Sequence, residues 1–360
     1  MCLFGRKMNI AKKLGLEVEP FCRMILTTKM LLSNVLGHAA ELHYEKYLIK
    51  NNIKFQKAPT DTHYDYVLDI VRDQVKRWET SSTNKKKIGV NLVQTHGNRS
   101  GEGAFYTTSD FDRLILFDVG FNKFKIINMA NIPRNPKFAG YITGKFGVPR
   151  NEDETLFGFD LEFLTALKIK NTAFPEAIEN LRRKYNLTYV QLLEKCCNLT
   201  LKEIDSLFSE ENFRLITGAK GFAAEEHFNI FLKRKGIQYK QMKDMYNKVD
   251  HLVKGRIRVQ VKIPHQKSVD ENHWAFKTHK SHGHGLLELY KANEFDIVAL
   301  FIGFEIDESK SRYFPISVKE EFIFVPVSDL ERYPKNHNYL KRVNKIRKDR
   351  YKVNDISLLN

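Results

Sequence analysis

The chain has 360 residues, 42% of them hydrophobic, and it carries a formal net charge of +16. This apolar fraction excludes a disordered chain, and the length is enough for two domains that each bury a core. No apolar run reaches the roughly 18 residues of a membrane span, and the first residues lack the apolar core of a signal peptide. We therefore expect an intracellular protein, cytoplasmic or nucleoid-associated, with no membrane segment.

The excess of basic residues favours a polyanionic partner. The chain holds 59 lysines and arginines against 43 aspartates and glutamates. Nucleic acid is the commonest polyanion inside cells, so we expect a nucleic-acid partner. A lysine-rich surface that only aids solubility would give the same charge, and charge alone does not separate DNA from RNA. The four cysteines have no spacing typical of zinc ligands or of a disulfide framework.

A repeated pattern follows an expected helical segment at residues 1–36. The stretch "GHAAELHYEKYLIKNNIKFQK" begins at Gly37, and "GFAAEEHFNIFLKRKGIQYKQ" begins at Gly221. Three further pairs recur in the same order and at nearly the same separation: "YDYVLDIVRDQVKRW" with "VDHLVKGRIRVQVKI", "QTHGN" with "KSHGHG", and "SDFDRLILFDV" with "NEFDIVALFIG". Because chance does not preserve both order and spacing, the sequence predicts an internal duplication.

Each copy is typical of an α/β unit with a helix, a hairpin, a further strand and a buried strand. We expect Asp112 and Asp296 to begin the buried strands as structural caps. The predicted organisation is a first repeat at 37–157, a helical segment at 158–217, a second repeat at 218–335 and a basic tail at 336–360.

Two regions outside the repeats have alternative interpretations. The helical segment contains two "NLT" helix starts at which threonine can cap. Two short helices joined tightly predict either a helix-turn-helix reader of DNA or a plain helical linker, and the pattern favours neither. The tail sequence "LKRVNKIRKDRYK" predicts a basic helix or arm.

The hairpin of the second copy places three polar residues together. Residues after Gly255 alternate, so that Gln260 and Lys262 share a polar, water-facing side of the strand. A three-residue loop centred on Gly255 would put Asp250 across from Gln260. A solvated sheet edge would also give this pattern.

The first copy keeps the same pairing with a different turn. Asp65 precedes Gln74 by nine residues, whereas Asp250 precedes Gln260 by ten. A loop shorter by one residue still places Asp65 opposite Gln74, with Lys76 two residues further on. A functional site would require such a partnership to survive a change in turn length, and a solvated edge would not.

A glutamate lies at the same helical position in both copies. Glu225 shares a helix face with Phe228 and Leu232, and Glu41 shares one with Tyr44 and Leu48. An acid on a core-facing side costs several kcal/mol unless it is paired or bound to a cation. One such glutamate could reach solvent at the rim, but two at one helical phase favour a functional role.

A helix glutamate, an aspartate and a Gln-x-Lys strand end resemble the PD-(D/E)xK nuclease superfamily, in the Gln-x-Lys variant of Mrr-like enzymes. Neither copy has the proline that often precedes the aspartate, and glutamine removes one anionic metal ligand. The resemblance implies an α/β fold of two restriction-endonuclease-like αβββαβ units with central mixed sheets, joined by a helical segment.

The resemblance also implies a chemistry and a set of site residues. It predicts an endodeoxyribonuclease of the restriction or homing type that uses Mg²⁺, with Mn²⁺ able to substitute, on double-stranded DNA. The lysines would orient the attacking water or stabilise the transition-state phosphate. The implied catalytic residues are Glu41, Asp65, Gln74, Lys76, Glu225, Asp250, Gln260 and Lys262, and all of these except the two lysines are implied metal ligands.

Several alternatives stay open at this point. His96 follows Lys76 at the same distance as His282 follows Lys262, and the two histidines are either DNA contacts or turn residues with no chemical role. A chain with two active lobes could cut both strands as a monomer, or a homodimer could use one lobe per chain. A junction-specific or repair nuclease, a non-catalytic DNA-binding protein built from nuclease folds, and an RNA-binding protein are the competing functions.

Overall fold

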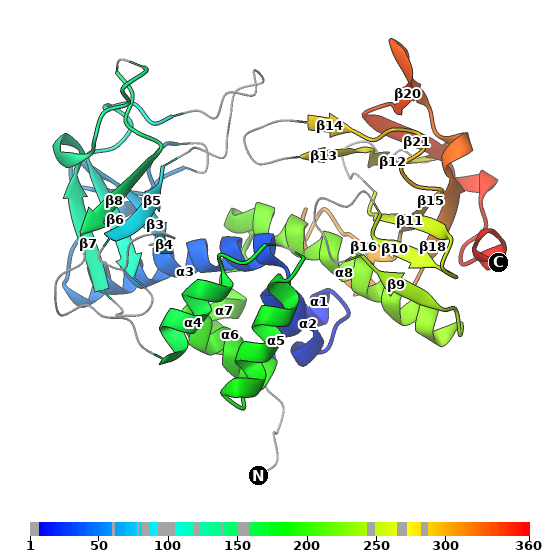
Figure 1. The fold of residues 1–360 in the computed structure, drawn as a ribbon, viewed down its shortest axis with the longest axis horizontal. Helices are drawn as coiled ribbons and strands as arrows, with labels where there is room; N and C mark the ends of the chain where they lie inside the picture. The colour runs from blue at the N-terminus through cyan, green and yellow to red at the C-terminus, as the bar shows by residue number, and fades with distance from the viewer. Residues whose placement is uncertain are drawn as a thin grey trace. The chain divides into compact units, whose positions relative to one another are not determined.

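In the computed structural model, the described residues are 7–59, 62–77, 79–80, 87–92, 105–118, 123–138, 140–149, 158–170, 172–242, 249–264, 272–281 and 287–360. The chain divides into two compact units. The N-terminal unit comprises Ile25–Leu207 and Gly283–Gly285, and the C-terminal unit comprises Met1–Met24, Phe208–His282 and Leu286–Asn360. Each unit contains one long helix and one five-stranded mixed sheet, so the expected α/β class is confirmed (Figure 1).

In the N-terminal unit, helix α3 (Lys29–Lys50) packs against strands β3 and β6. The strand order is β1-β2-β3-β6-β7. Strands β3 and β6 are parallel, and the other neighbours are antiparallel. The strands are β1 (Gln56–Lys57), β2 (Tyr66–Leu68), β3 (Val71–Arg77), β6 (Arg113–Asp118) and β7 (Lys123–Asn128).

The C-terminal unit repeats this arrangement. Helix α8 (Phe213–Arg234) packs against β11, and the strand order is β9-β10-β11-β15-β18. Only β11 and β15 are parallel within this sheet. The two units therefore share one sheet topology. The strands are β9 (Tyr239–Gln241), β10 (His251–Val253), β11 (Ile257–Lys262), β15 (Ile297–Phe301) and β18 (Phe322–Pro326).

The αβββαβ order also predicts a helix before the last strand of each unit. The described residues between β11 and β18 contain short strands and no helix. The short strands of this connection form two pairs, β13 (His279–Ser281) with β14 (Leu287–Leu289) and β16 (Phe304–Glu305) with β17 (Ser317–Val318), while β12 (His273–Lys277) pairs with β21 (Val343–Arg347) from beyond β18. The remaining strands are β19 (Arg332–Tyr333) with β20 (Asn336–Leu340), and β4 (Glu79–Thr80), β5 (Lys87–Asn91) and β8 (Lys145–Pro149) in a three-stranded sheet of the N-terminal unit.

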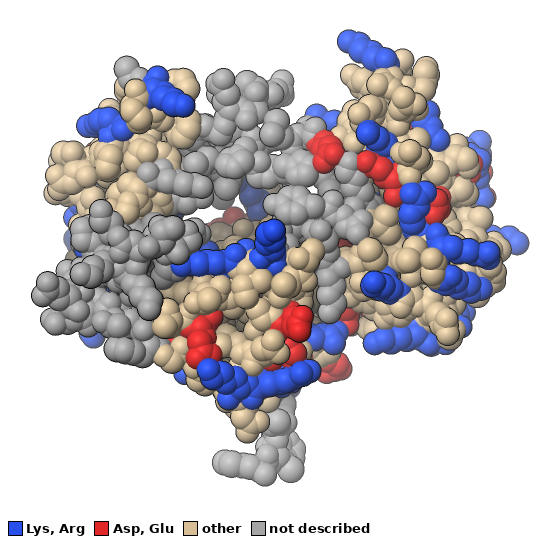
Figure 2. Space-filling model, viewed as in Figure 1, with Lys and Arg blue, Asp and Glu red and all other residues tan. Residues whose placement is uncertain are grey.

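The tail is not the expected basic helix or arm. Its residues 343–347 form β21, which pairs antiparallel with β12. Asn344 and Ile346 are buried while Lys345 and Arg347 are exposed, so the segment has the two-residue period of a strand. On the face drawn in Figure 2, several basic side chains are spread over the surface of the C-terminal unit.

The other helices are short. Thr188 and Thr200 each accept a hydrogen bond at a helix start, from Gln191 N at 3.1 Å and Glu203 N at 3.4 Å, so both expected threonine caps are confirmed. No helix in the described parts of the chain has the length and apolar character needed to cross a membrane. The short helices are α1 (Asn9–Lys13), α2 (Val18–Thr27), α4 (Gly158–Ala166), α5 (Phe174–Lys184), α6 (Tyr189–Cys197) and α7 (Leu201–Ser206).

Both faces of each central sheet are buried, which corrects the expected water-facing side. One face packs on the long helix, through Val75 in the N-terminal unit and Val261 in the C-terminal unit. The opposite face, which carries the glutamines, is covered by a second apolar cluster that contains Tyr106 or Tyr290. Additional strands cover this face, so the polar residues lie at the edge of a core.

Candidate active site

The strand registers confirm the predicted cross-strand pairs. In the C-terminal unit Val253 pairs with Ile257, which leaves a three-residue loop centred on Gly255 and puts Asp250 across from Gln260. Gly255 has φ of +70°, a conformation that glycine adopts at little cost. The N-terminal unit reaches the same pairing with a different turn.

In the N-terminal unit the loop has two residues. Leu68 pairs with Val71, and Tyr66 pairs with Asp73, so the next pair outward is Asp65 with Gln74. The main chain holds this register, because Asp65 N donates to Asp73 O at 2.8 Å.

The glutamine amide holds the aspartate in both units. Gln260 Nε2 donates a hydrogen bond to Asp250 Oδ2, and Val261 N donates to the same oxygen at 2.7 Å. Gln74 Nε2 likewise donates to Asp65 Oδ2, which also accepts from the amide of the following residue at 2.7 Å. The glutamines are each 3% exposed. Two donors on one oxygen fix the orientation of each carboxylate.

A tyrosine lies beside each lysine. Lys262 Nζ donates to Tyr290 Oη at 3.2 Å and lies 5.0 Å from the centre of that ring. Lys76 Nζ lies 5.7 Å from the centre of the Tyr106 ring, and Tyr106 Oη donates to Gln74 Oε1 at 3.4 Å. Burial by itself lowers the pKa of each lysine, but the neighbouring tyrosine and aspartate outweigh burial and raise it.

The tyrosines were not predicted from the sequence. Tyr106 and Tyr290 are separated by the same distance along the chain as Gly37 and Gly221, which begin the two copies. They therefore belong to the repeated set, and this spacing was the signal that could have identified them.

The helix glutamates lie near these residues. Glu41 and Glu225 are half-buried, and their neighbours Tyr44 and Phe228 are buried as expected. Burial, followed by the negative charge of Glu41, raises the pKa of Asp65 to about 7.

His38 Nδ1 donates to Glu41 Oε2 at 3.2 Å. Burial would lower the pKa of His38, but the hydrogen bond and charge of Glu41 outweigh it and raise that pKa. The C-terminal unit has Phe222 at the corresponding position, so this histidine is particular to the N-terminal unit.

The residues present fit a magnesium ion. Mg²⁺ is usually bound in proteins through one or two carboxylates and keeps several waters. Each unit offers an aspartate, a nearby glutamate and an amide oxygen, and Gln260 Oε1 is buried with no hydrogen-bond partner among the described residues. Within those residues there is no group of three or more His, Cys, Asp or Glu side chains that could hold a metal. The amide oxygen and waters would have to complete the coordination.

Other predicted residues have different outcomes. His96 and His282 lie outside the described residues. Asp112 and Asp296 directly precede β6 and β15, and each accepts hydrogen bonds from an arginine: Asp112 from Arg72 Nε at 3.0 Å, and Asp296 from Arg258 Nε at 3.1 Å. Both arginines also donate from their backbone amides at 2.8 Å. Each aspartate therefore links the start of one parallel strand to an arginine of the neighbouring parallel strand.

A polar trio around the buried Asp73 lies in the N-terminal unit and was not predicted. Asp73 is 0% exposed. It accepts from Arg113 Nε and Nη2, each at 2.8 Å, and from Tyr44 Oη at 2.6 Å. The C-terminal unit has Val259, Ile297 and Phe228 at these places, so the sequence difference between the copies was the only available signal.

Comparisons with known proteins add only distant likeness among solved structures. No protein-family model matches the chain, and no curated protein matches it. Among solved structures, a bacterial homing endonuclease, I-Ssp6803I, is similar over 35% of this chain and 83% of its own, with 17% identity and a TM-score of 0.26. A likeness at this level carries no conclusion about the activity of this chain.

Proposed function

We propose that this chain is a Mg²⁺-dependent endodeoxyribonuclease of the restriction or homing type, with one catalytic site in each of two duplicated units that resemble the PD-(D/E)xK superfamily. The observation that carries the proposal is the paired Asp–Gln contact followed by a lysine on the same strand. It occurs in both units although the turns differ in length.

The electrostatics of the N-terminal site favour a bound cation. In the N-terminal unit two acids lie close together, and burial with the charge of Glu41 raises the pKa of Asp65. A divalent cation would relieve this cost, because it favours the ionised form of both carboxylates. The residues that would hold it are Glu41, Asp65 and Gln74 in the N-terminal unit, and Glu225, Asp250 and Gln260 in the C-terminal unit.

Each protein group then has a definite task in hydrolysis. When bound, the metal ion polarises the phosphate and acidifies water. The ammonium group of Lys76 or Lys262 donates to a phosphate oxygen and stabilises the charge that develops there. The tyrosine beside each lysine limits the positions of the amine. The water oxygen bonds to phosphorus as one P–O ester bond breaks, and the leaving oxygen ends with a proton from that water.

The charge of the chain supports DNA as the substrate. A net charge of +16 attracts the phosphate backbone without regard to sequence. Two sites in one chain would let a monomer cut both strands, whereas a homodimer would need only one site per chain.

Plasmid cleavage tests the proposal. Supercoiled plasmid with Mg²⁺ should become linear, and EDTA should stop the reaction. Lys76→Ala and Lys262→Ala should each lower cutting at their own site by at least about a hundredfold and leave nicked circles. The double variant should bind DNA without cutting it.

Lys233→Ala is the matched control, because this lysine lies on α8 and is exposed. It should cut like the unchanged protein. Cleavage that persists in EDTA would contradict the metal-dependent mechanism. Full linearisation by Lys262→Ala would show that the C-terminal site is not required.

A further inference from the structure

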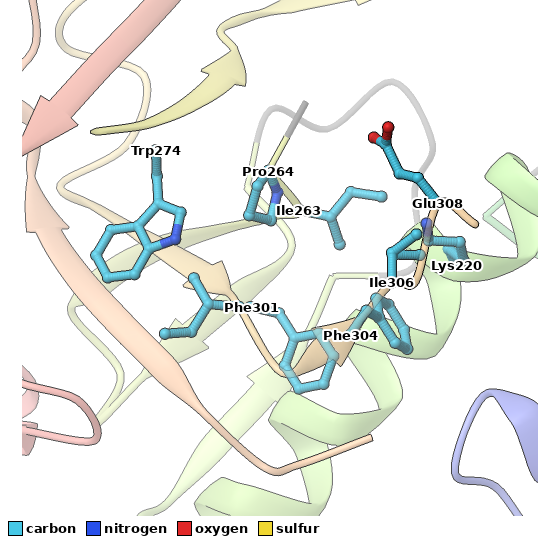
Figure 3. Close-up of a pocket in the computed structure, with 9 residues that line it drawn as sticks. Lys220, Ile263, Pro264, Trp274, Phe301, Phe304, Ile306 and Glu308 are labelled. Carbon is cyan, nitrogen blue, oxygen red and sulfur yellow. The ribbon is translucent and has the colours of Figure 1, made fainter. Parts of the chain in front are cut away.

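The C-terminal unit contains a cavity of about 290 Å³ whose wall includes residues next in the chain to Lys262. Ile263 and Pro264, which directly follow Lys262, form one part of its wall, and Trp274 and Phe304 form others (Figure 3). Its volume is near the lower limit of small-molecule pockets, which start at about 300 Å³. Seven of the nine lining residues are apolar or aromatic and two are charged, so the cavity suits a flat, partly polar group.

A buried lysine lines this cavity. Lys220 is 6% exposed, and its Nζ lies 5.7 Å from the centre of the Phe304 ring. Within the described parts of the chain, no residue forms a hydrogen bond or an ion pair with this ammonium group. Burial lowers the pKa of Lys220 to about 8. Apart from the Phe304 ring, no described group faces this amine, so an acceptor brought by a ligand would give it a hydrogen-bond partner.

The fold itself does not need a lysine there. The corresponding position on α3 of the N-terminal unit is Leu36, which directly precedes Gly37 as Lys220 precedes Gly221. Leu36 is 1% exposed, so a leucine fills this helical position in the same topology without a charge. The amine at Lys220 points to a task that only the C-terminal unit performs.

The cavity also offers a hydrogen-bond acceptor. Glu308 is exposed and lines the cavity together with Lys220 (Figure 3). One donor and one acceptor beside aromatic walls match a nucleobase, whose edge presents both kinds of group and whose face stacks on aromatic rings.

We infer that this cavity receives one unstacked nucleobase of bound DNA, which Lys220 recognises through a base acceptor atom. The inference rests on the proposed function for the source of the base. Unstacking a base costs a few kcal/mol, which stacking and the hydrogen bond to Lys220 would offset. Because the cavity wall continues from Lys262, a base held there would position the neighbouring phosphate for cutting.

The two tryptophans of the chain permit a direct binding test. Trp78→Phe leaves Trp274, in the cavity wall, as the sole tryptophan. Its fluorescence is then titrated with the four deoxynucleoside monophosphates and with 2-deoxyribose 5-phosphate, which lacks a base. We expect saturable quenching by at least one nucleotide and none by the sugar phosphate. Lys220→Met in this background should weaken nucleotide binding about tenfold or more.

Lys233→Met is the matched control, since it removes the same charge from an exposed position on the same helix. It should keep the affinity of the Trp78→Phe protein. Absence of quenching by every nucleotide up to about 10 mM, or equal quenching by the sugar phosphate, would overturn the inference. Equal affinity in Lys220→Met would do the same.

These outcomes separate the cavity from the nuclease proposal. The fluorescence test needs no cleavage, so nucleotide binding by a protein that fails to cut plasmid would support the cavity and contradict the nuclease. The comparison between nucleotide and sugar phosphate uses the Trp78→Phe protein alone. It remains decisive even if Lys220→Met does not fold.

Discussion

Gln260 donates a hydrogen bond from its side-chain amide to Oδ2 of Asp250, the same oxygen that accepts the backbone amide of Val261. The N-terminal unit repeats this arrangement with Gln74 and Asp65. The glutamine thus fixes the aspartate without help from a metal ion. Its NH₂ group donates a hydrogen bond at a position where a second carboxylate would repel the aspartate.

Gln260→Glu should lower the stability of the protein and raise its affinity for divalent metal ions. The variant loses the amide donor and places two carboxylates opposite each other, so we expect a loss of about 1–3 kcal/mol without divalent ions. Mg²⁺ or Mn²⁺ should raise the stability of the variant more than that of the unchanged protein. An ion that binds the folded state more tightly stabilises it more. Thermal unfolding with and without each ion measures both effects.

Gln238→Glu provides the control for this experiment. Gln238 is exposed and precedes β9, so the same change of charge there should alter neither stability nor the response to divalent ions. Equal responses of Gln260→Glu and the unchanged protein would contradict a metal ion at Gln260.

The ion pair of Asp73 with Arg113 should be costly to break. Asp73 is 0% exposed, and removal of its carboxylate in Asp73→Ala leaves a half-buried arginine without its partner. We expect a loss of about 3–5 kcal/mol in the free energy of unfolding. Denaturation by urea measures the loss, which should exceed that of Tyr44→Phe because the latter removes one hydrogen bond and no charge.

Replacement of the whole trio should cost much less. The C-terminal unit places Phe228, Val259 and Ile297 at the corresponding positions. A triple variant that copies these residues into the N-terminal unit should lie within about 1–2 kcal/mol of the unchanged protein, because no charge is left unpaired. A triple variant as unstable as Asp73→Ala would refute this explanation.

Gly255→Ala should destabilise the C-terminal hairpin. Gly255 has φ of +70°, and no atom of the described residues lies within 4 Å of an added Cβ, so backbone strain alone sets the cost. We expect a loss of about 1–2 kcal/mol, measured by thermal unfolding.

Gly221→Ala in the same unit should have the opposite sign. Gly221 lies inside helix α8, and an added Cβ meets nothing within 4 Å among the described residues. Alanine should stabilise the helix by about 0.5–1 kcal/mol. If Gly255→Ala and Gly221→Ala shift the melting temperature in the same direction, backbone conformation does not decide the effect of alanine at these two glycines.

Glu179 should make stability depend on pH in the acid range. It accepts hydrogen bonds from Arg182, Arg183 and Tyr189, and the Arg182 bond is the largest of the effects that lower its pKa to about 2. The folded pKa lies below the ordinary value of about 4.3, so this stabilisation is present above pH ~4.3 and is lost as pH falls toward 2.

Glu179→Gln removes that dependence. The variant should be less stable at neutral pH by about 1–3 kcal/mol, and the gap should close as pH falls below ~4. Tyr189→Phe, which removes one of the bonds, should cost less and retain the dependence. Thermal unfolding at several pH values gives the comparison, and a gap that stays constant down to pH ~3 would exclude the assigned cause.

Local sequence patterns were sufficient to predict several features. Turn length and strand alternation set the register of a hairpin, so Asp65–Gln74 and Asp250–Gln260 could be paired without a structure. Helix caps depend on residues three apart, which is why Thr188 could be predicted. Sequence blocks that keep their order and spacing also indicated two units of similar topology, which the two sheets have.

Only the tertiary structure decided the environment of these residues. It brings β21 from the tail onto β12, covers the glutamine face with a second core, and places Tyr290 beside Lys262. It also places Lys220, which is 6% exposed, in the wall of a cavity beside the Phe304 ring. These contacts join residues far apart in the chain, and the burial that decides their cost exists only after the sheets and helices have packed. The sequence by itself could therefore determine which residues pair across a hairpin, but not which apolar and charged groups surround them.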